Sequence, residues 1–138
     1  MTQWVPARTA TPERSMMVAT SCGCAPFISK ETIAPFSRAV PMIRSEDVFA
    51  RYGGEEFVIM SRSTDPPSAA VVSERVRQHV EKFGFEYESK RIPVTVSLGV
   101  AGMPHGEIKA PEDLLARADR ALYEAKRAGR NRMVQAAM

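Results

Sequence analysis

The sequence predicts an α/β (α+β) domain in which a mostly antiparallel sheet is flanked by helices. Apolar runs on both sides of a Gly-Gly pair at 53–54 indicate a hairpin, and apolar residues at helical spacing indicate one helix before residue 84 and another after residue 110. Between these helices, residues 93–101 alternate as a half-buried strand does. With 138 residues, 44% hydrophobic and 25% charged, the chain suffices for one globular domain and is too short for two.

The first 43 residues form an atypical segment, whereas residues 44–138 carry consistent signals of secondary structure. Prolines interrupt any helix that begins near residue 29, so a loosely structured arm is the simplest interpretation. In an alternative interpretation, residues 16–20 add a strand to the sheet and residues 32–43 form part of a helix. The abrupt change near residue 44 also allows a shifted reading frame or a misplaced start upstream of it.

Charge and cysteine content narrow the functional classes. A net charge of +3 and a pI near 9.1 suit a phosphate-bearing ligand, and the absence of interleaved basic and aromatic residues argues against nucleic-acid binding. Cys22 and Cys24 are the two cysteines, which excludes a disulfide framework and a four-cysteine zinc site. The apolar stretch at 16–28 is too short to span a bilayer. We expect a cytoplasmic domain, with a secretory or lipoprotein signal ending at Cys22 as the alternative.

The predicted hairpin lies in residues 44–60, RSEDVFARYGGEEFVIM. Its turn needs positive φ at the central residues, which glycine adopts without a steric penalty. The glycines offer bare backbone N–H groups that an anion can approach, and two adjacent carboxylates, Glu55 and Glu56, follow them. Because side chains alternate across a strand, these carboxylates should point to opposite faces. One could bind a metal ion while the other meets a different part of the ligand.

The first predicted helix starts at the polar, proline-rich residues 63–67 and ends at Gly84. Strands are then expected at 85–87 and 93–101, joined by a polar loop at 88–91. The apolar face of that helix comprises Ala69, Val72, Val76, Val80 and Phe83. One face of the second strand comprises Val94, Val96, Leu98 and Val100, with Thr95, Ser97 and Gly99 on the other.

The second predicted helix begins near Pro111 and ends in a basic turn before Gly129. Carboxylates in its first turn favour the positive end of the helix dipole, and a short strand at 132–135 follows its end. Taken alone, Lys126 in the last turn is a cation that stabilises a helix C-terminus. The buried stripe of this helix comprises Leu114, Leu115, Ala118, Ala121, Leu122 and Ala125.

Four segments resemble one known family in order and spacing. RYGGEEF at 51–57 resembles the signature turn of the GGDEF domain, the catalytic domain of diguanylate cyclases, in the variant with Glu at its third position. VTVSLGVA at 94–101 resembles the family's inner strand, ADRALYEAK at 118–126 its last helix, and GRNRMV at 129–134 the segment after that helix. The resemblance covers about residues 44–134, the C-terminal two-thirds of such a domain, and implies a nucleotidyl-cyclase-like fold.

The resemblance implies a reaction between two GTP-loaded domains that meet head to tail as a homodimer. The 3′-hydroxyl of each nucleotide attacks the α-phosphorus of the other, which yields cyclic di-GMP and pyrophosphate. Glu55 matches the ligand of Mg²⁺ or Mn²⁺, ions that prefer hard oxygen ligands, and Glu56 matches a position close to the metal and nucleotide. Gly53 and Gly54 match positions that leave room for GTP. Lys126 and Arg130 match the pair that binds its phosphates.

An inhibitory site is also implied. Arg44 and Asp47 form an RxxD similar to the family's product-inhibition site for cyclic di-GMP, and Arg75 matches a second arginine of that site. The alternative interpretation of the RSED tetrapeptide is an ordinary solvated charge cluster. Its position ahead of the hairpin favours the inhibitory site.

The sequence departs from the family pattern before the hairpin. Members carry a metal-binding Asp-x-Asp, a Phe-Lys-x-Ile-Asn-Asp segment and a Gly-Asp pair that recognise guanine. Here Asp47 is the first aspartate, Asn131 the single asparagine and Gly23 the single glycine ahead of residue 53. The loss of guanine contacts or of a metal ligand predicts a strong decrease in rate. Two functions therefore remain: a diguanylate cyclase, and a catalytically degenerate domain that binds cyclic di-GMP.

Overall fold

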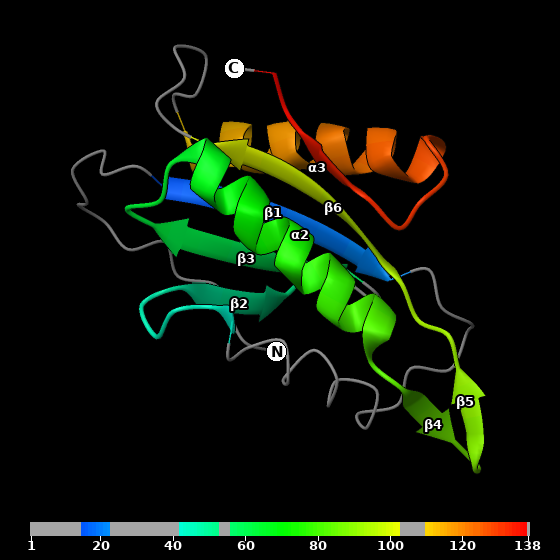
Figure 1. The fold of residues 1–138 in the computed structure, drawn as a ribbon. Helices are drawn as coiled ribbons and strands as arrows, with labels where there is room; N and C mark the ends of the chain where they lie inside the picture. The colour runs from blue at the N-terminus through cyan, green and yellow to red at the C-terminus, as the bar shows by residue number, and fades with distance from the viewer. Residues whose placement is uncertain (1–14, 23–41, 53–55, 103–109, 138) are drawn as a thin grey trace.

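The computed structural model describes residues 15–22, 42–52, 56–102 and 110–137 (Figure 1). A five-stranded sheet has the order β2-β3-β1-β6-β7, and helices α2 (Pro66–Lys82) and α3 (Pro111–Arg127) cover its two faces. All pairings in it are antiparallel except β6 with β7, so the predicted mostly antiparallel α/β fold is confirmed. None of the helices within these ranges is long and apolar enough to cross a membrane.

The predicted hairpin is confirmed on both sides of its turn. Strands β2 (Val48–Arg51) and β3 (Glu56–Arg62) pair antiparallel, from Val48 opposite Met60 to Arg51 opposite Phe57. The amide of Tyr52 donates to the carbonyl of Glu56 at 2.8 Å, next to the turn. Turn residues 53–55 lie outside the described residues, and so does the expected opposition of Glu55 and Glu56.

The centre of the sheet is a strand from the atypical N-terminal segment. Strand β1 (Ser15–Cys22) lies between β3 and β6 and is antiparallel to both. The alternative in which residues 16–20 add a strand is therefore confirmed. The helix considered for residues 32–43 falls almost wholly outside the described residues.

Strand β6 (Val96–Gly102) is buried along nearly its whole length because each face is covered by a helix. Val96, Leu98 and Val100 pack with the buried residues of α2, as the predicted alternation requires, and Ala101 packs with α3 on the other face. The strand starts at Val96, three residues later than the predicted 93–101, where its pairing with Cys22 of β1 begins.

A small separate hairpin corrects the prediction of a loop at 88–91. Strands β4 (Phe85–Tyr87) and β5 (Lys90–Ile92) pair antiparallel around a turn in which Glu88 and Ser89 have φ of 49° and 60°. Two-residue hairpin turns need this left-handed backbone, which Asn and Gly normally signal. A Glu-Ser pair carries no such signal, so this hairpin was missed.

The helix ends follow local chemistry. The carboxylate of Asp65 accepts the amide of Ser68 at the start of α2. That helix ends at Phe83, whose backbone is extended (φ −68°, ψ 126°), one residue before the predicted stop at Gly84. Helix α3 spans the predicted residues, and its glycine stop is confirmed, since Gly129 has a φ of 113°. Strand β7 (Met133–Gln135) follows it.

The core lies on both faces of the sheet. Because side chains alternate along β3, Phe57 and Ile59 pack towards α2, whereas Val58 and Met60 pack towards α3. Three residues of the predicted helix stripes, Val72, Phe83 and Leu115, are only half-buried, whereas Ser73, which lay outside the stripe, is buried on α2. This arrangement places the first residue of β3, Glu56, beside α3.

Candidate functional site

Two residues of the predicted nucleotide site meet in space. Glu56 begins β3 and Lys126 lies in the last turn of α3, and the Lys126 Nζ atom is 3.5 Å from the Glu56 Oε1 atom. Their side chains are 31% exposed for Lys126 and 41% exposed for Glu56. Such an exposed ion pair contributes little to folding stability, so both groups remain accessible to a ligand.

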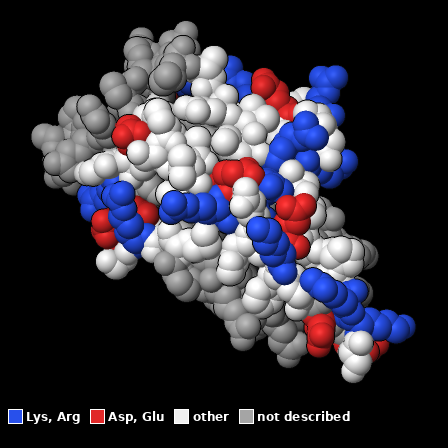
Figure 2. Space-filling view, viewed as in Figure 1, with Lys and Arg blue, Asp and Glu red and all other residues white. Residues whose placement is uncertain are grey.

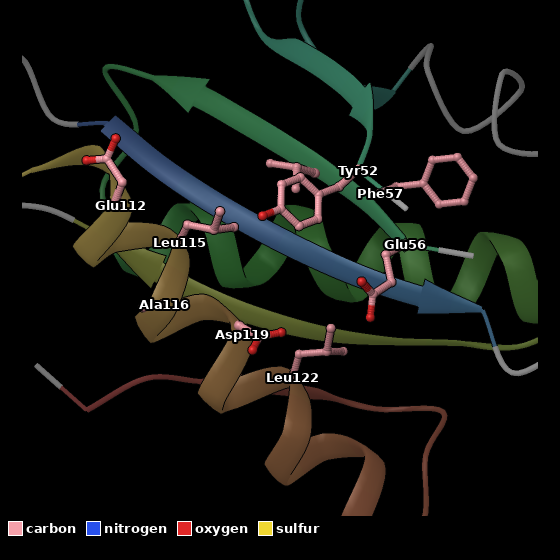
Figure 3. A pocket seen from close by; sticks show the side chains of 9 residues that line it. Tyr52, Glu56, Phe57, Glu112, Leu115, Ala116, Asp119 and Leu122 are labelled. Atoms are coloured by element: carbon pink, nitrogen blue, oxygen red, sulfur yellow. The ribbon is translucent and has the colours of Figure 1, made fainter. Parts of the chain in front are cut away.

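A hollow of about 470 Å³ opens beside this ion pair (Figure 3). Glu56 and Asp119 face it from β3 and from α3, with Tyr52 on the hairpin side and the apolar side chains of α3 opposite it. It is large enough for much of a small-molecule ligand. The residues that line it are Tyr52, Glu56, Phe57, Val58, Glu112, Leu115, Ala116, Asp119 and Leu122.

The lining includes the carboxylates of Glu56, Glu112 and Asp119. Within the described part of the chain, however, no three carboxylate, imidazole or thiol groups lie close enough together to bind a metal ion. The described residues alone therefore do not assemble a metal site. The predicted ligand Glu55 and the glycines Gly53 and Gly54 lie outside them.

Arg130 lies exposed just beyond α3, in a turn with an unusual backbone. Gly129, Arg130 and Asn131 have φ of 113°, 62° and 47°. The amide of Arg130 donates to the carbonyl of Ala125 at 3.0 Å, and that of Gly129 donates to Lys126 at 3.4 Å. This is a glycine-stopped helix end, in which the turn satisfies the last carbonyls and places Arg130 after the turn that carries Lys126.

Sequence reasoning missed a polar cluster that links α2 to this turn. Arg77 bonds both carboxylate oxygens of Glu74 and also reaches Glu81 at 2.9 Å. Its Nη1 atom donates to the Oδ1 atom of Asn131 at 2.8 Å, and the Nδ2 atom of Asn131 donates to Glu81 at 2.7 Å. The helical spacing of the charges was visible in the sequence, but the contact with Asn131 joins residues 54 positions apart and left no local signal.

These contacts change the ionisation of the three charged groups. The hydrogen bond from Arg77 lowers the pKa of Glu74 against the opposing effect of burial. The bond from Asn131, followed by that from Arg77, lowers the pKa of Glu81. The bond to Glu74 raises the pKa of Arg77. Each shift favours the charged form, so the cluster is held together by ionised groups.

The predicted inhibitory residues come from two places. Arg44 and Asp47 directly precede β2, at the end of the hairpin opposite its turn, and Arg75 lies on α2. The Asp47 carboxylate accepts the amide of Arg44 at 3.1 Å and that of Arg62 at 3.3 Å, which makes it a structural cap of this turn. Arg44 and Arg75 are exposed, and no hydrogen bond or ion pair within the described ranges joins Arg75 to either of the other two. Figure 2 shows basic and acidic side chains intermingled on the α2 face, without a continuous basic surface.

The chain is similar to several diguanylate cyclases. It is 43% identical over 90 residues to Diguanylate cyclase A of Treponema denticola, covering 65% of this chain and 24% of that protein. It is 39% identical over 110 residues to the response regulator PleD of Caulobacter vibrioides, covering 78% of this chain and 24% of PleD. The chain thus spans about a quarter of the length of these curated relatives.

Solved structures agree on the fold. The GGDEF domain of DgcB from Caulobacter crescentus, in complex with c-di-GMP, matches with a TM-score of 0.77 at 25% identity, over 89% of this chain and 78% of that chain. The active GGEEF domain of a diguanylate cyclase from Vibrio cholerae matches with a TM-score of 0.75 at 23% identity, over 91% and 85%. The family model described as diguanylate cyclase, GGDEF domain, matches residues 37–132, so the chain belongs to the GGDEF domain family of diguanylate cyclases.

Proposed function

We propose that this chain is a diguanylate cyclase domain that condenses two molecules of GTP into one of cyclic di-GMP and two of pyrophosphate. The observation that carries the proposal is the contact of Glu56 with Lys126 beside the hollow, in a member of the GGDEF family. A carboxylate at the signature turn thereby lines a ligand-sized space and also contacts a cation from the helix end. In the reaction each 3′-oxygen forms a bond to the α-phosphorus of the other nucleotide while the bond to the leaving pyrophosphate breaks.

The residues divide into groups with distinct tasks. Lys126 and Arg130 bind the triphosphate, and their positive charges offset the charge that develops on the leaving pyrophosphate. Glu55 would hold Mg²⁺ or Mn²⁺, and a bound ion would supply charge neutralisation at the phosphates and a more acidic attacking hydroxyl. Glu56 holds Lys126 near the hollow until the nucleotide arrives. The glycines before Glu55 leave room for the nucleotide to approach the backbone.

Catalysis requires two copies of the domain, because one domain binds one GTP and the reaction joins two. We propose a transient head-to-tail homodimer in the cytoplasm, where GTP is available. The product, cyclic di-GMP, binds a second site at Arg44, Asp47 and Arg75 and inhibits the enzyme. Support for this site comes from the similarity to a GGDEF domain that was solved with c-di-GMP. The cap formed by Asp47 would hold Arg44 at the surface.

A second candidate function is favoured by the composition ahead of the hairpin. Residues 1–46 contain no aspartate and no asparagine, the residue types that read guanine and bind the second metal ion in this family. On that observation the chain is a degenerate cyclase domain that retains binding of cyclic di-GMP. The two candidates make opposite predictions for turnover and the same prediction for the inhibitory site.

The deciding experiment is turnover of GTP by the purified chain with Mg²⁺ or Mn²⁺, followed as cyclic di-GMP by chromatography. We expect Glu55→Ala to decrease product by about 100-fold or more, because the metal loses its ligand. Glu86→Ala, an exposed glutamate on β4, is the matched control and should leave the rate unchanged. A folded chain that forms no product would contradict the cyclase, and binding of cyclic di-GMP that Arg44→Ala abolishes would then support the second candidate.

A further inference from the structure

The turn that carries Arg130 has a backbone that its residue types disfavour. Gly129, Arg130 and Asn131 all have positive φ. Glycine adopts this conformation freely and asparagine tolerates it, but arginine is seldom found there. Interactions from elsewhere in the fold must therefore hold Arg130 in place.

Asn131 supplies those interactions through nearly every polar atom it has. Its amide donates to the buried Ser97 Oγ atom at 3.2 Å, which ties the turn to β6. Its side-chain Oδ1 atom accepts from Arg77 at 2.8 Å, and its Nδ2 atom donates to Glu81 at 2.7 Å, which tie the turn to α2. A residue bound to two other elements resists rotation of its own backbone.

The group that holds Asn131 is itself rigid. The side chain of Arg77 is only 14% exposed, and its guanidinium is forked around Glu74, with N–O distances of 2.8 to 3.0 Å. It also reaches Glu81 at 2.9 Å. A planar guanidinium fixed by two carboxylates presents its remaining N–H in one direction, towards Asn131.

We infer that Asn131 is a positioning residue, held by Arg77, Glu81 and Ser97, that fixes the backbone of Arg130 so that its guanidinium is presented to the phosphates of the nucleotide. The inference rests on the proposed function, which assigns Arg130 to the phosphates. Arg130 is fixed on both sides, by its own amide bond to Ala125 and by the anchored Asn131. Only its side-chain torsions remain free, so less entropy is lost when it binds an anion.

A fixed position for Arg130 matters because the residue lies at the C-terminal end of α3. The C-terminus of α3 carries the negative end of the helix dipole, which repels phosphate. Lys126 and Arg130 can bind phosphate there only if their side chains stay close enough to it for the attraction to outweigh that repulsion. Lys126 lies 3.5 Å from Glu56, and the anchored turn restrains Arg130 beside it.

The test is a double-mutant cycle on GTP affinity with Asn131→Gly, Arg130→Ala and the double variant, measured by calorimetry in Mg²⁺. Glycine keeps the left-handed backbone accessible but removes both anchoring hydrogen bonds of the side chain. We expect each single variant to weaken GTP binding about tenfold, and the double variant no further than either, because both act through one guanidinium. Arg120→Ala, an exposed arginine of α3, is the matched control and should bind GTP normally.

Amide hydrogen exchange in the chain without nucleotide adds an independent readout. We expect the Arg130 amide, bonded to Ala125, to exchange about tenfold faster in Asn131→Gly, whereas core amides of β6 are unchanged. Asn131→Asp keeps the acceptor for Arg77 and should lie between the wild type and Asn131→Gly in both readouts. It also serves as the test variant if Asn131→Gly does not fold.

The outcomes separate this inference from the function on which it rests. Normal GTP affinity or an unchanged Arg130 amide in Asn131→Gly, beside a weakened Arg130→Ala, overturns the positioning role alone. Additive losses in the double variant also overturn it. Absence of GTP binding in the folded wild-type chain instead overturns the proposed function, and the phosphate role of the turn falls with it.

Discussion

Gly99 is the position where one added methyl group should disturb the fold most. A Cβ atom at Gly99 would lie 2.1 Å from the carbonyl oxygen of Ala118 and 2.3 Å from the amide nitrogen of Leu122. Both atoms belong to the backbone of α3, so no rotation of a side chain relieves the overlap. Gly99→Ala therefore forces α3 away from β6.

The size of the effect follows from these distances. Ordinary contacts to a Cβ atom begin near 3.4 Å, so α3 must move by roughly 1 Å, which opens the packing of buried Leu114, Ala118 and Leu122. Overpacking of this kind costs about 1–3 kcal/mol, and displacement of backbone lies at the upper end of that range. The gain from a stiffer unfolded chain offsets only about 0.4–1 kcal/mol. We expect the free energy of unfolding to fall by about 2 kcal/mol.

The assay is urea unfolding followed by circular dichroism, with two glycine-to-alanine controls in the same chain. At Gly84 the nearest atom to an added Cβ is 3.8 Å away, on the side chain of Arg91, so Gly84→Ala should be nearly neutral. At Gly102 the nearest atom is the Cγ atom of Pro66 at 2.6 Å, on a side chain, so the loss should be intermediate. With m of about 1–3 kcal/mol/M, a loss of about 2 kcal/mol in Gly99→Ala should lower the midpoint by about 0.7–2 M.

A midpoint for Gly99→Ala within experimental error of that for Gly84→Ala would contradict this prediction, because it would mean that α3 does not pack on β6 through this glycine. The same variant also reports on the site. Since α3 carries Lys126, its displacement should weaken GTP binding, whereas Gly84→Ala should leave GTP affinity unchanged.

Two further predictions concern carboxylates. The hydrogen bond from Asn131 is the largest cause of the lowered pKa of Glu81 in the folded chain. As the pH falls, Glu81 is therefore protonated first in the unfolded chain. The stability that ionised Glu81 contributes is present above its usual pKa of 4.5 and is lost below it. Glu81→Gln should reduce the slope of unfolding free energy between pH 5 and pH 3 in urea titrations, and an equal slope would count against the cluster. Asp47→Ala should lower the unfolding free energy by about 1–2 kcal/mol because two amides, including that of Arg62, lose their acceptor. Exposed Glu46→Ala is its control, and equal losses in the two variants would contradict the capping role.

Local signals explain how much of the fold was predictable. Pro111 and Gly129 bound α3 where a helix start and stop are chemically required, and the Gly-Gly pair announced the β2–β3 hairpin. The β4–β5 hairpin was missed because Glu88 adopts a left-handed backbone without a residue type that signals it. Helix α2 ends one residue before the stop expected at Gly84. Phe83 packs partly against the core, and its backbone is extended rather than helical.

The resemblance placed Glu56 and Lys126 at one candidate site, but it did not predict that the two side chains touch. Glu56 and Lys126 lie far apart in the sequence, and nothing local indicates their contact, but both match positions of one family motif. The anchoring of Asn131 by Arg77 had no such guide, because a hydrogen bond between residues 54 positions apart appears only when the fold is known. Periodicity identified the helix faces but not which polar residues those faces bring together.

The position of β1 determines where this domain can be divided. This strand comes from residues 15–22, yet it hydrogen-bonds to β3 on one side and β6 on the other, so it alone joins the β2–β3 pair to the β6–β7 pair. A fragment that starts at residue 37, where the family model begins to match, would lack β1 and would expose two sheet edges in place of one continuous sheet. The boundary of recognisable sequence is therefore not the boundary of the folding unit, and fragments for expression should retain β1.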